Sequence, residues 1–115
     1  MQEPMFLVYD GQVPTNADAP PGDALVLAEF PVTISRQPGE LRVCGVDFAA
    51  NATGTATFGR LIGADGSVVC QMREGDLVLL LESGARTWTI LSGMWLQTDF
   101  VLAVPGLTVT AAERA

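Results

Sequence analysis

The segment GRLIGADGSVVCQ, residues 59–71, carries the clearest β-hairpin signal in the chain and decides the fold class. Two apolar runs flank Asp65 and Gly66, and an Asp-Gly pair readily supplies the positive φ values of a tight type I′ turn. The segment that follows, GDLVLLLESG (residues 75–84), is apolar with no obvious solvent-facing side. We therefore predict three consecutive antiparallel strands, a β-meander, within residues 55–82.

Strand signals continue in both directions from this hairpin. Short β-branched and aromatic runs alternate with turn sequences such as PPGD, QPGE and SGA, at the spacing of roughly 8–12 residues that is typical of a sandwich or barrel. The predicted strands are residues 5–11, 23–30, 41–48, 55–62, 67–72, 76–83, 87–92, 95–104 and 107–110. Apolar residues nowhere recur at helical spacing, so helices should be minor. We predict a single all-β domain spanning residues 1–115, an antiparallel β-sandwich or barrel.

The segment DGQVPTNADAPPGD, residues 10–23, interrupts this pattern. It is polar and rich in Pro, Asn and Asp, so it cannot join a sheet ladder, and it is too long for a hairpin turn. We predict a surface loop or arm at this position.

The composition limits the partners of the chain. Its 115 residues are 49% hydrophobic, carry a formal net charge of −7, and include six basic residues, all of them arginine. An acidic surface without lysine argues against nucleic acid and against anionic membrane surfaces as partners. No apolar run approaches the ~20 residues of a membrane helix, and no signal-peptide pattern opens the chain. We therefore expect a protein that is made in a cytoplasm and binds no membrane.

The composition also limits the chemistry. Without histidine or lysine, Ser-His-Asp and Cys-His arrangements, Schiff bases and phosphate-binding loops of the Walker type are excluded. The acidic residues occur singly at predicted turns, and turn formation accounts for them. Cys44 and Cys70 lack CxxC spacing and are expected to be buried free thiols, with a cross-strand disulfide as the alternative. The sequence thus predicts no enzyme, no metal and no cofactor.

The apolar content exceeds what one small sheet is expected to hide. If residues 76–83 form a strand, Val78 and Leu80 point away from the leucines beside them, and a sandwich sheet has only one inner face. We predict that Val78 and Leu80 contact another protein chain. Coverage by the loop at residues 10–23 is the alternative.

Two further residues are candidates for the same interface. Arg60 lies in the otherwise apolar segment TATFGRLI, and its charge needs a carboxylate or carbonyl partner, in its own chain or across an interface, or a route to water for its head. Trp95 begins the face of WLQTDFVLAV that should meet solvent, where tryptophan is a common interface anchor. Packing at the edge of the core and stacking on a sugar are the alternatives for Trp95.

Three stretches together resemble small structural proteins of tailed-bacteriophage virions. They are YDGQVPTNADAPPGDALVLAEF (residues 9–30), ATGTATFGRLIGADGSVVCQ (52–71) and GDLVLLLESGARTWTILSG (75–93), and the bulky pair Met94-Trp95 departs from the pattern. The resemblance implies a building block of the virion, in the first place a capsid cement or decoration protein that is homo-oligomeric and binds the major capsid protein. A tail, neck or fibre component is the close alternative. A carbohydrate-binding β-sandwich module is the alternative of another class.

Overall fold

The protein is described by a computed structural model that covers residues 4–16, 19–20, 22–45, 48–73, 76–81, 83, 85–103 and 109–111. These residues form strands and no helix, which confirms the predicted all-β class. The strands are β1 (Met5–Asp10), β2 (Leu25–Gln37), β3 (Glu40–Gly45), β4 (Phe48–Ala49), β5 (Gly54–Thr55), β6 (Phe58–Ile62), β7 (Val68–Arg73), β8 (Leu80–Leu81), β9 (Thr89–Ile90), β10 (Trp95–Gln97), β11 (Asp99–Ala103) and β12 (Val109–Ala111).

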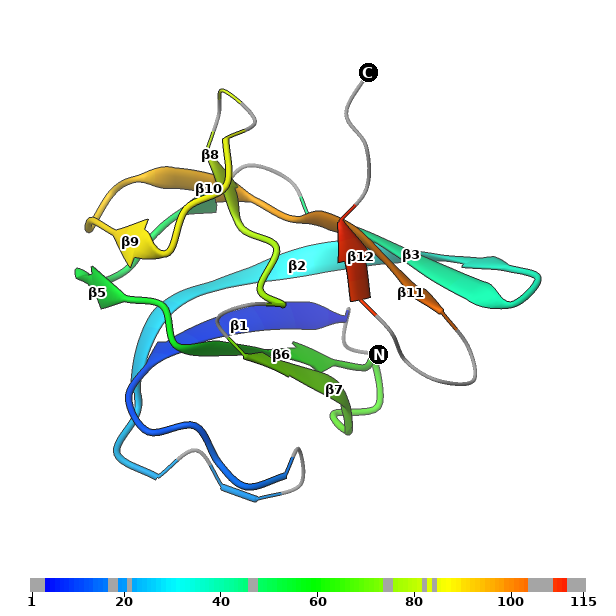
Figure 1. Cartoon of the computed structure of the whole chain (residues 1–115), viewed down its shortest axis with the longest axis horizontal. Helices are drawn as coiled ribbons and strands as arrows, with labels where there is room; N and C mark the ends of the chain where they lie inside the picture. The colour runs from blue at the N-terminus through cyan, green and yellow to red at the C-terminus, as the bar shows by residue number, and fades with distance from the viewer. Residues whose placement is uncertain are drawn as a thin grey trace.

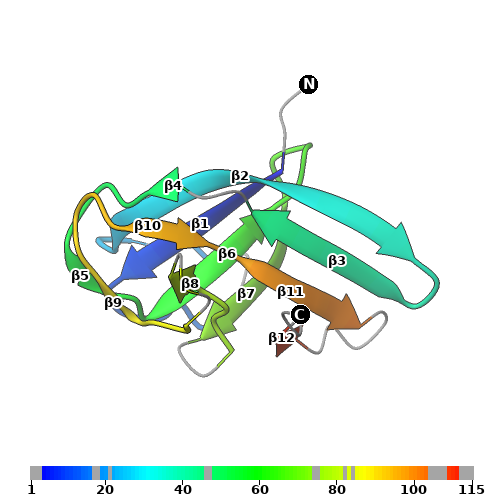
Figure 2. The same cartoon turned by 90° about the horizontal axis from the view of Figure 1, so that it is seen from above.

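One large curled sheet and two small sheets enclose the core. The large sheet has the order β12-β11-β3-β2-β1-β6-β7, and its neighbouring strands are antiparallel. The small sheets, β4-β10-β8 and β5-β9, lie over the β1 side of the large one (Figure 1). The chain passes almost straight from β10 into β11, so one stretch of sequence joins a small sheet to the large sheet (Figure 2).

The alternation predicted for residues 95–104 is confirmed where the structure describes it. Leu96, Thr98, Phe100 and Leu102 are all buried, whereas Trp95 is 54% exposed. Phe100 meets Phe6 of β1 edge-to-face, with ring centroids 5.7 Å apart, so this face of β11 closes the core against β1.

The predicted hairpin of residues 59–71 forms, but its turn differs from the expected type. Ile62 ends β6 and Val68 begins β7, with Leu61 opposite Cys70. Gly66 donates its N–H to the Gly63 carbonyl at 2.9 Å, and Gly63 donates to Ser67 at 2.8 Å, which closes a three-residue loop. Gly66 has φ +89°, the left-handed residue that ends such a loop. The prediction of a two-residue type I′ turn is therefore wrong.

The prediction of a third strand in the meander is also wrong. Of the described residues of this segment, 76–81 and 83, only Leu80 and Leu81 are in a strand, β8, and they pair with β10 instead of β7. Residues 77–79 have no strand partner and rise through the interior between the two layers (Figure 1). In the described part of residues 76–83, the predicted strand is thus reduced to the two residues of β8.

This path buries the leucine-rich segment inside its own chain. Leu77 and Leu79 are 0% exposed, Val78 is 1% exposed and Leu80 is 7% exposed. The Thr98 hydroxyl donates to the Val78 carbonyl at 2.5 Å and holds the segment against the chain between β10 and β11. The prediction that another chain covers Val78 and Leu80 is therefore wrong, because a segment crossing the core is covered on all sides by both layers.

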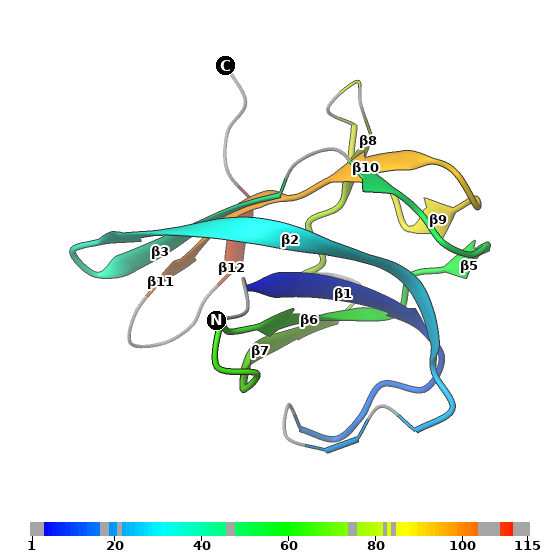
Figure 3. The same ribbon diagram turned by 180° about the vertical axis from the view of Figure 1, so that it is seen from behind.

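The β2–β3 hairpin is longer than expected. The predicted strand ended at residue 30, but β2 continues through Pro31 to Gln37, where Pro38 and Gly39 turn the chain into β3. The tip of this hairpin projects past the end of β1 (Figure 3). The predicted strand was too short because proline commonly ends a strand, whereas Pro31 lies inside β2.

Candidate functional site

The four candidate interface residues do not form one surface. Val78 and Leu80 lie in the core, and Arg60, 4% exposed, lies beneath the loop between β1 and β2. Only Trp95 presents most of its side chain to solvent. Of the four candidate interface residues, Trp95 is therefore the one that is exposed on the described surface.

Trp95 belongs to a shallow apolar groove, which we call the Trp95 groove. Its lining residues are Leu81, Ser83, Met94 and Trp95, from β8, the segment after it and the start of β10. Met94 is half-buried and packs against the core, as does Leu81. Leu91, 53% exposed, lies in the turn just before Met94. The sequence pattern identified Trp95 and the bulky Met94 beside it, but not Leu81 and Ser83, because these two residues come from a separate part of the chain.

The turn that carries the groove is closed and tied to its neighbours by backbone hydrogen bonds. Met94 donates its N–H to the Leu91 carbonyl at 2.9 Å, and Gly93, with φ +86°, makes the reversal that this bond closes. Gly93 also donates to the Ala50 carbonyl, and Ala50 donates to the Met94 carbonyl, each at 2.8 Å. Trp95 is thus presented on a fixed backbone, which lowers the entropic cost of ordering a binding surface.

Arg60 fastens the predicted arm to the body. Its Nε donates to Gln71 Oε1 at 2.9 Å, and its Nη2 donates to the carbonyl of Ala19 in the arm. Gln71 in turn donates through Nε2 to the Pro14 carbonyl at 3.1 Å. The guanidinium carbon lies 5.9 Å from the centroid of the Phe58 ring, within cation–π range. Arg60 is therefore an internal clamp rather than an interface residue.

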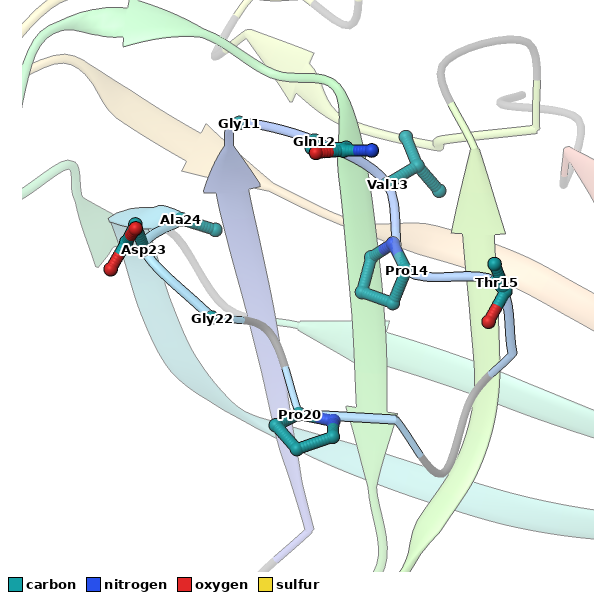
Figure 4. Close-up of a pocket in the computed structure, with 9 residues that line it drawn as sticks. All are labelled: Gly11, Gln12, Val13, Pro14, Thr15, Pro20, Gly22, Asp23 and Ala24. Carbon is teal, nitrogen blue, oxygen red and sulfur yellow. The ribbon is translucent and has the colours of Figure 1, made fainter.

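The arm covers an aromatic pair on the outer face of the large sheet. Tyr9 and Phe58 stack with their centroids 4.7 Å apart and are both buried. Burial raises the pKa of Tyr9 above its ordinary value. Figure 4 shows residues 11–15 and 22–24 of the arm passing over the strands β1, β6 and β7.

The arm also encloses a hollow of about 450 Å³. Its lining is Gly11, Gln12, Val13, Pro14, Thr15, Pro20, Gly22, Asp23 and Ala24 (Figure 4). Among the described residues of that lining, Asp23 is the one with an ionisable side chain.

The cysteines are free, but only one is buried. Cys70 faces the core, and burial raises its pKa to about 11. Cys44 lies exposed on β3, with its Sγ 3.5 Å from Oδ1 of Asp99, which also pairs with Arg42 at 3.3 Å. The expected burial of Cys44 is wrong, because its side chain points to the solvent face of the sheet.

Over the described part of the chain, no group of three or more Cys, Asp and Glu side chains lies together in a way that could hold a metal ion. Nor do the described residues include a helix of the length and hydropathy needed to cross a membrane. Comparison with family models, with curated proteins and with solved structures found no match.

Proposed function

We propose that this protein is a non-catalytic structural component of a tailed-bacteriophage virion, and that it binds a protein of the shell through the Trp95 groove. The observation that carries the binding role is the exposure of Trp95 beside Met94 and Leu81 on a hydrogen-bonded turn. Buried tryptophan anchors supply much of the energy of protein interfaces. The resemblance of three sequence stretches to small virion proteins supports the choice of partner.

The acidic charge supports an outer position on the particle. A chain of net charge −7 is repelled by packaged nucleic acid, so a site facing solvent is favoured over one facing the genome. Repetition over many equivalent shell sites makes weak individual contacts sufficient for stable attachment. A capsid cement or decoration protein combines this outer position with repetition over many equivalent shell sites.

The test is binding to particles that lack this protein. Purified protein is mixed with particles from a phage deleted for its gene, and bound protein is measured by co-sedimentation and located by cryo-electron microscopy. We expect Trp95→Ala to keep the fold and to weaken binding by at least about tenfold. Leu25→Ala is the matched control, because Leu25 is 50% exposed on β2, outside the Trp95 groove.

The location of the bound protein separates the alternatives. Density repeated over the shell supports a cement protein, whereas a ring at the neck or density along the tail would support a tail or neck component instead. Equal binding of wild type, Trp95→Ala and Leu25→Ala would contradict the role of the groove. No binding to any particle would contradict the virion proposal.

Carbohydrate binding is the second candidate, and one observation favours it. Trp95 is half-exposed beside the polar Ser83, and stacking on an exposed aromatic ring with a nearby hydroxyl is a common mode of sugar recognition. Binding on a glycan array that is lost in Trp95→Ala would support this function over the virion one.

A further inference from the structure

The chain contains two Asp-Gly pairs, Asp10-Gly11 and Asp65-Gly66. An Asp-Gly bond is chemically labile, because glycine has no side chain to shield its backbone nitrogen from the neighbouring carboxyl group. The nitrogen attacks the side-chain carbon Cγ, an N–Cγ bond forms and a Cγ–O bond breaks, and the amide proton and the carboxyl OH leave as one water molecule. Water then reopens this succinimide ring at either carbonyl, which gives aspartate or its isomer isoaspartate with no net change in atoms.

The Asp65-Gly66 pair lies in the loop that joins β6 to β7. Both residues and the following Ser67 are exposed, so burial does not keep water from the pair. Every residue from Phe58 to Arg73 is described, so the contacts of this loop are known throughout. Any protection of the pair must therefore come from hydrogen bonds within the loop.

The attacking nitrogen is already engaged. Gly66 donates its N–H to the Gly63 carbonyl at 2.9 Å, and Gly63 donates to the Ser67 carbonyl at 2.8 Å, so the two bonds fix the loop at both ends. To reach Cγ of Asp65, the Gly66 nitrogen must leave this arrangement and give up its proton. The fold thus has to open locally before the ring can close.

The carboxyl group under attack is engaged as well. Oδ1 of Asp65 accepts hydrogen bonds from the N–H of Ser67 at 3.0 Å and from its hydroxyl at 2.6 Å. Bonds of this kind, from a side chain to the residue two positions on, hold turns in place. They also lower the pKa of Asp65 below its ordinary value and so favour the carboxylate. The carboxylate is the less reactive form, because only the neutral acid carries an OH that is easily expelled.

We propose that Asp65-Gly66 is a latent site of isoaspartate formation, and that the Ser67 hydroxyl is the group that suppresses the reaction in the folded protein. Isoaspartate adds one carbon to the main chain, so the modified loop cannot keep both the Gly66–Gly63 and the Gly63–Ser67 hydrogen bonds. The modification would then loosen the end of the β6–β7 hairpin. This proposal does not depend on the function assigned to the Trp95 groove.

The other Asp-Gly pair supplies an internal reference. Oδ2 of Asp10 accepts a hydrogen bond from the N–H of Thr55 at 3.2 Å, and Gly11 donates its N–H to Oγ1 of Thr57 at 3.1 Å. Neither of these bonds involves Ser67. Loss of the Ser67 hydroxyl should therefore change the reaction at Asp65 alone, whereas a general loosening of the fold should change it at both pairs.

The test compares the full-length wild type with Ser67→Ala after prolonged incubation in neutral buffer. Cleavage after arginine places the two pairs in separate peptides, residues 1–36 and 61–73, and chromatography with mass spectrometry then separates the isoaspartyl form of each. At residue 65, we expect isoaspartate to form at least about tenfold faster in Ser67→Ala, because the lost hydrogen bond is charge-assisted. At residue 10, the two proteins should react at the same rate.

Two variants and one condition serve as controls. Ser67→Thr keeps a hydroxyl at this position and should react as the wild type does. Ser35→Ala removes the hydroxyl of an exposed serine on β2, and it should also leave the rate at residue 65 unchanged. In concentrated urea, where the loop is unfolded, wild type and Ser67→Ala should form isoaspartate at residue 65 equally fast.

Three results would overturn the proposal. The first is an equal rate at residue 65 in folded wild type and folded Ser67→Ala, which would show that the hydroxyl does not protect the pair. The second is a rate in the folded wild type as high as in urea, which would show that the loop gives no protection. The third is an equal acceleration at residues 10 and 65 in Ser67→Ala, which would assign the effect to loss of the fold.

Discussion

At the scale of single residues, burial of a thiol makes the stability of this protein depend on pH. Cys70 is 8% exposed, and its burial disfavours the thiolate, so its pKa rises from 9.0 to about 11 on folding. The unfolded chain therefore releases the thiol proton at a lower pH than the folded chain. The contribution of Cys70 is fully present below about pH 9 and is lost as the pH rises to about 11.

We expect the free energy of unfolding to fall between pH 8 and pH 10.5 by about 2 kcal/mol more in the wild type than in Cys70→Val. Urea unfolding at the two pH values measures this difference. Tyr9, whose pKa burial also raises, acts in the same direction in both proteins and cancels in the comparison. An identical pH dependence of the two proteins would show that burial does not protect the Cys70 thiol.

At the scale of elements, the described residues of the arm are held by contacts that reach across the sheet. Arg60 and Gln71 hold it from β6 and β7, through the carbonyls of Ala19 and Pro14. At the base of the arm, Thr57 accepts a hydrogen bond from Gly11 N–H at 3.1 Å and donates to its carbonyl at 2.8 Å. The arm thus forms the cover of the Tyr9–Phe58 pair.

We expect Arg60→Met to release the arm and to lower the free energy of unfolding by about 1–3 kcal/mol. The change removes the hydrogen bonds that Arg60 donates to the carbonyl of Ala19 and to Oε1 of Gln71. Hydrogen exchange of the described arm amides should accelerate, while exchange in β2 and β3 stays unchanged. Arg73→Met, at an exposed arginine of β7, is the matched control. Unchanged arm exchange in Arg60→Met would contradict the clamp.

Strands in which buried and exposed side chains alternate were predictable from the sequence. Segments whose path is determined by contacts with distant residues were not. The alternation from Leu96 to Leu102 indicated which side chains are buried, because one face of this stretch is mostly apolar and the other carries polar residues. The apolar run at residues 77–80 has no such alternation, so sequence alone could not distinguish a two-faced strand from a segment crossing the core. Trp95 was predictable as an exposed aromatic residue, whereas the partners of Arg60 lie 11 and 41 positions away in the chain.

At the scale of the whole molecule, the segment of residues 77–80 fills the space between the curled sheet and the small sheets. The core that it joins contains residues of both layers, among them Phe6 of β1, Ile90 of β9 and Leu96 of β10. The high apolar content of the chain is therefore used largely inside one subunit. Its exposed large apolar side chains, among the described residues, are Leu25, Leu91 and Trp95.

If the chain covers its own leucines, its stability should not depend on protein concentration. We expect Leu79→Ala to lower the free energy of unfolding by about 2–5 kcal/mol, because it opens a cavity where Leu79 is 0% exposed. Leu25→Ala, at a half-exposed leucine, should cost no more than about 0.5 kcal/mol. Urea unfolding over a hundredfold range of concentration should give one midpoint for each protein. A midpoint that rises with concentration would mean that association contributes to the folded state, because mass action then stabilises it, and that a second subunit completes this core.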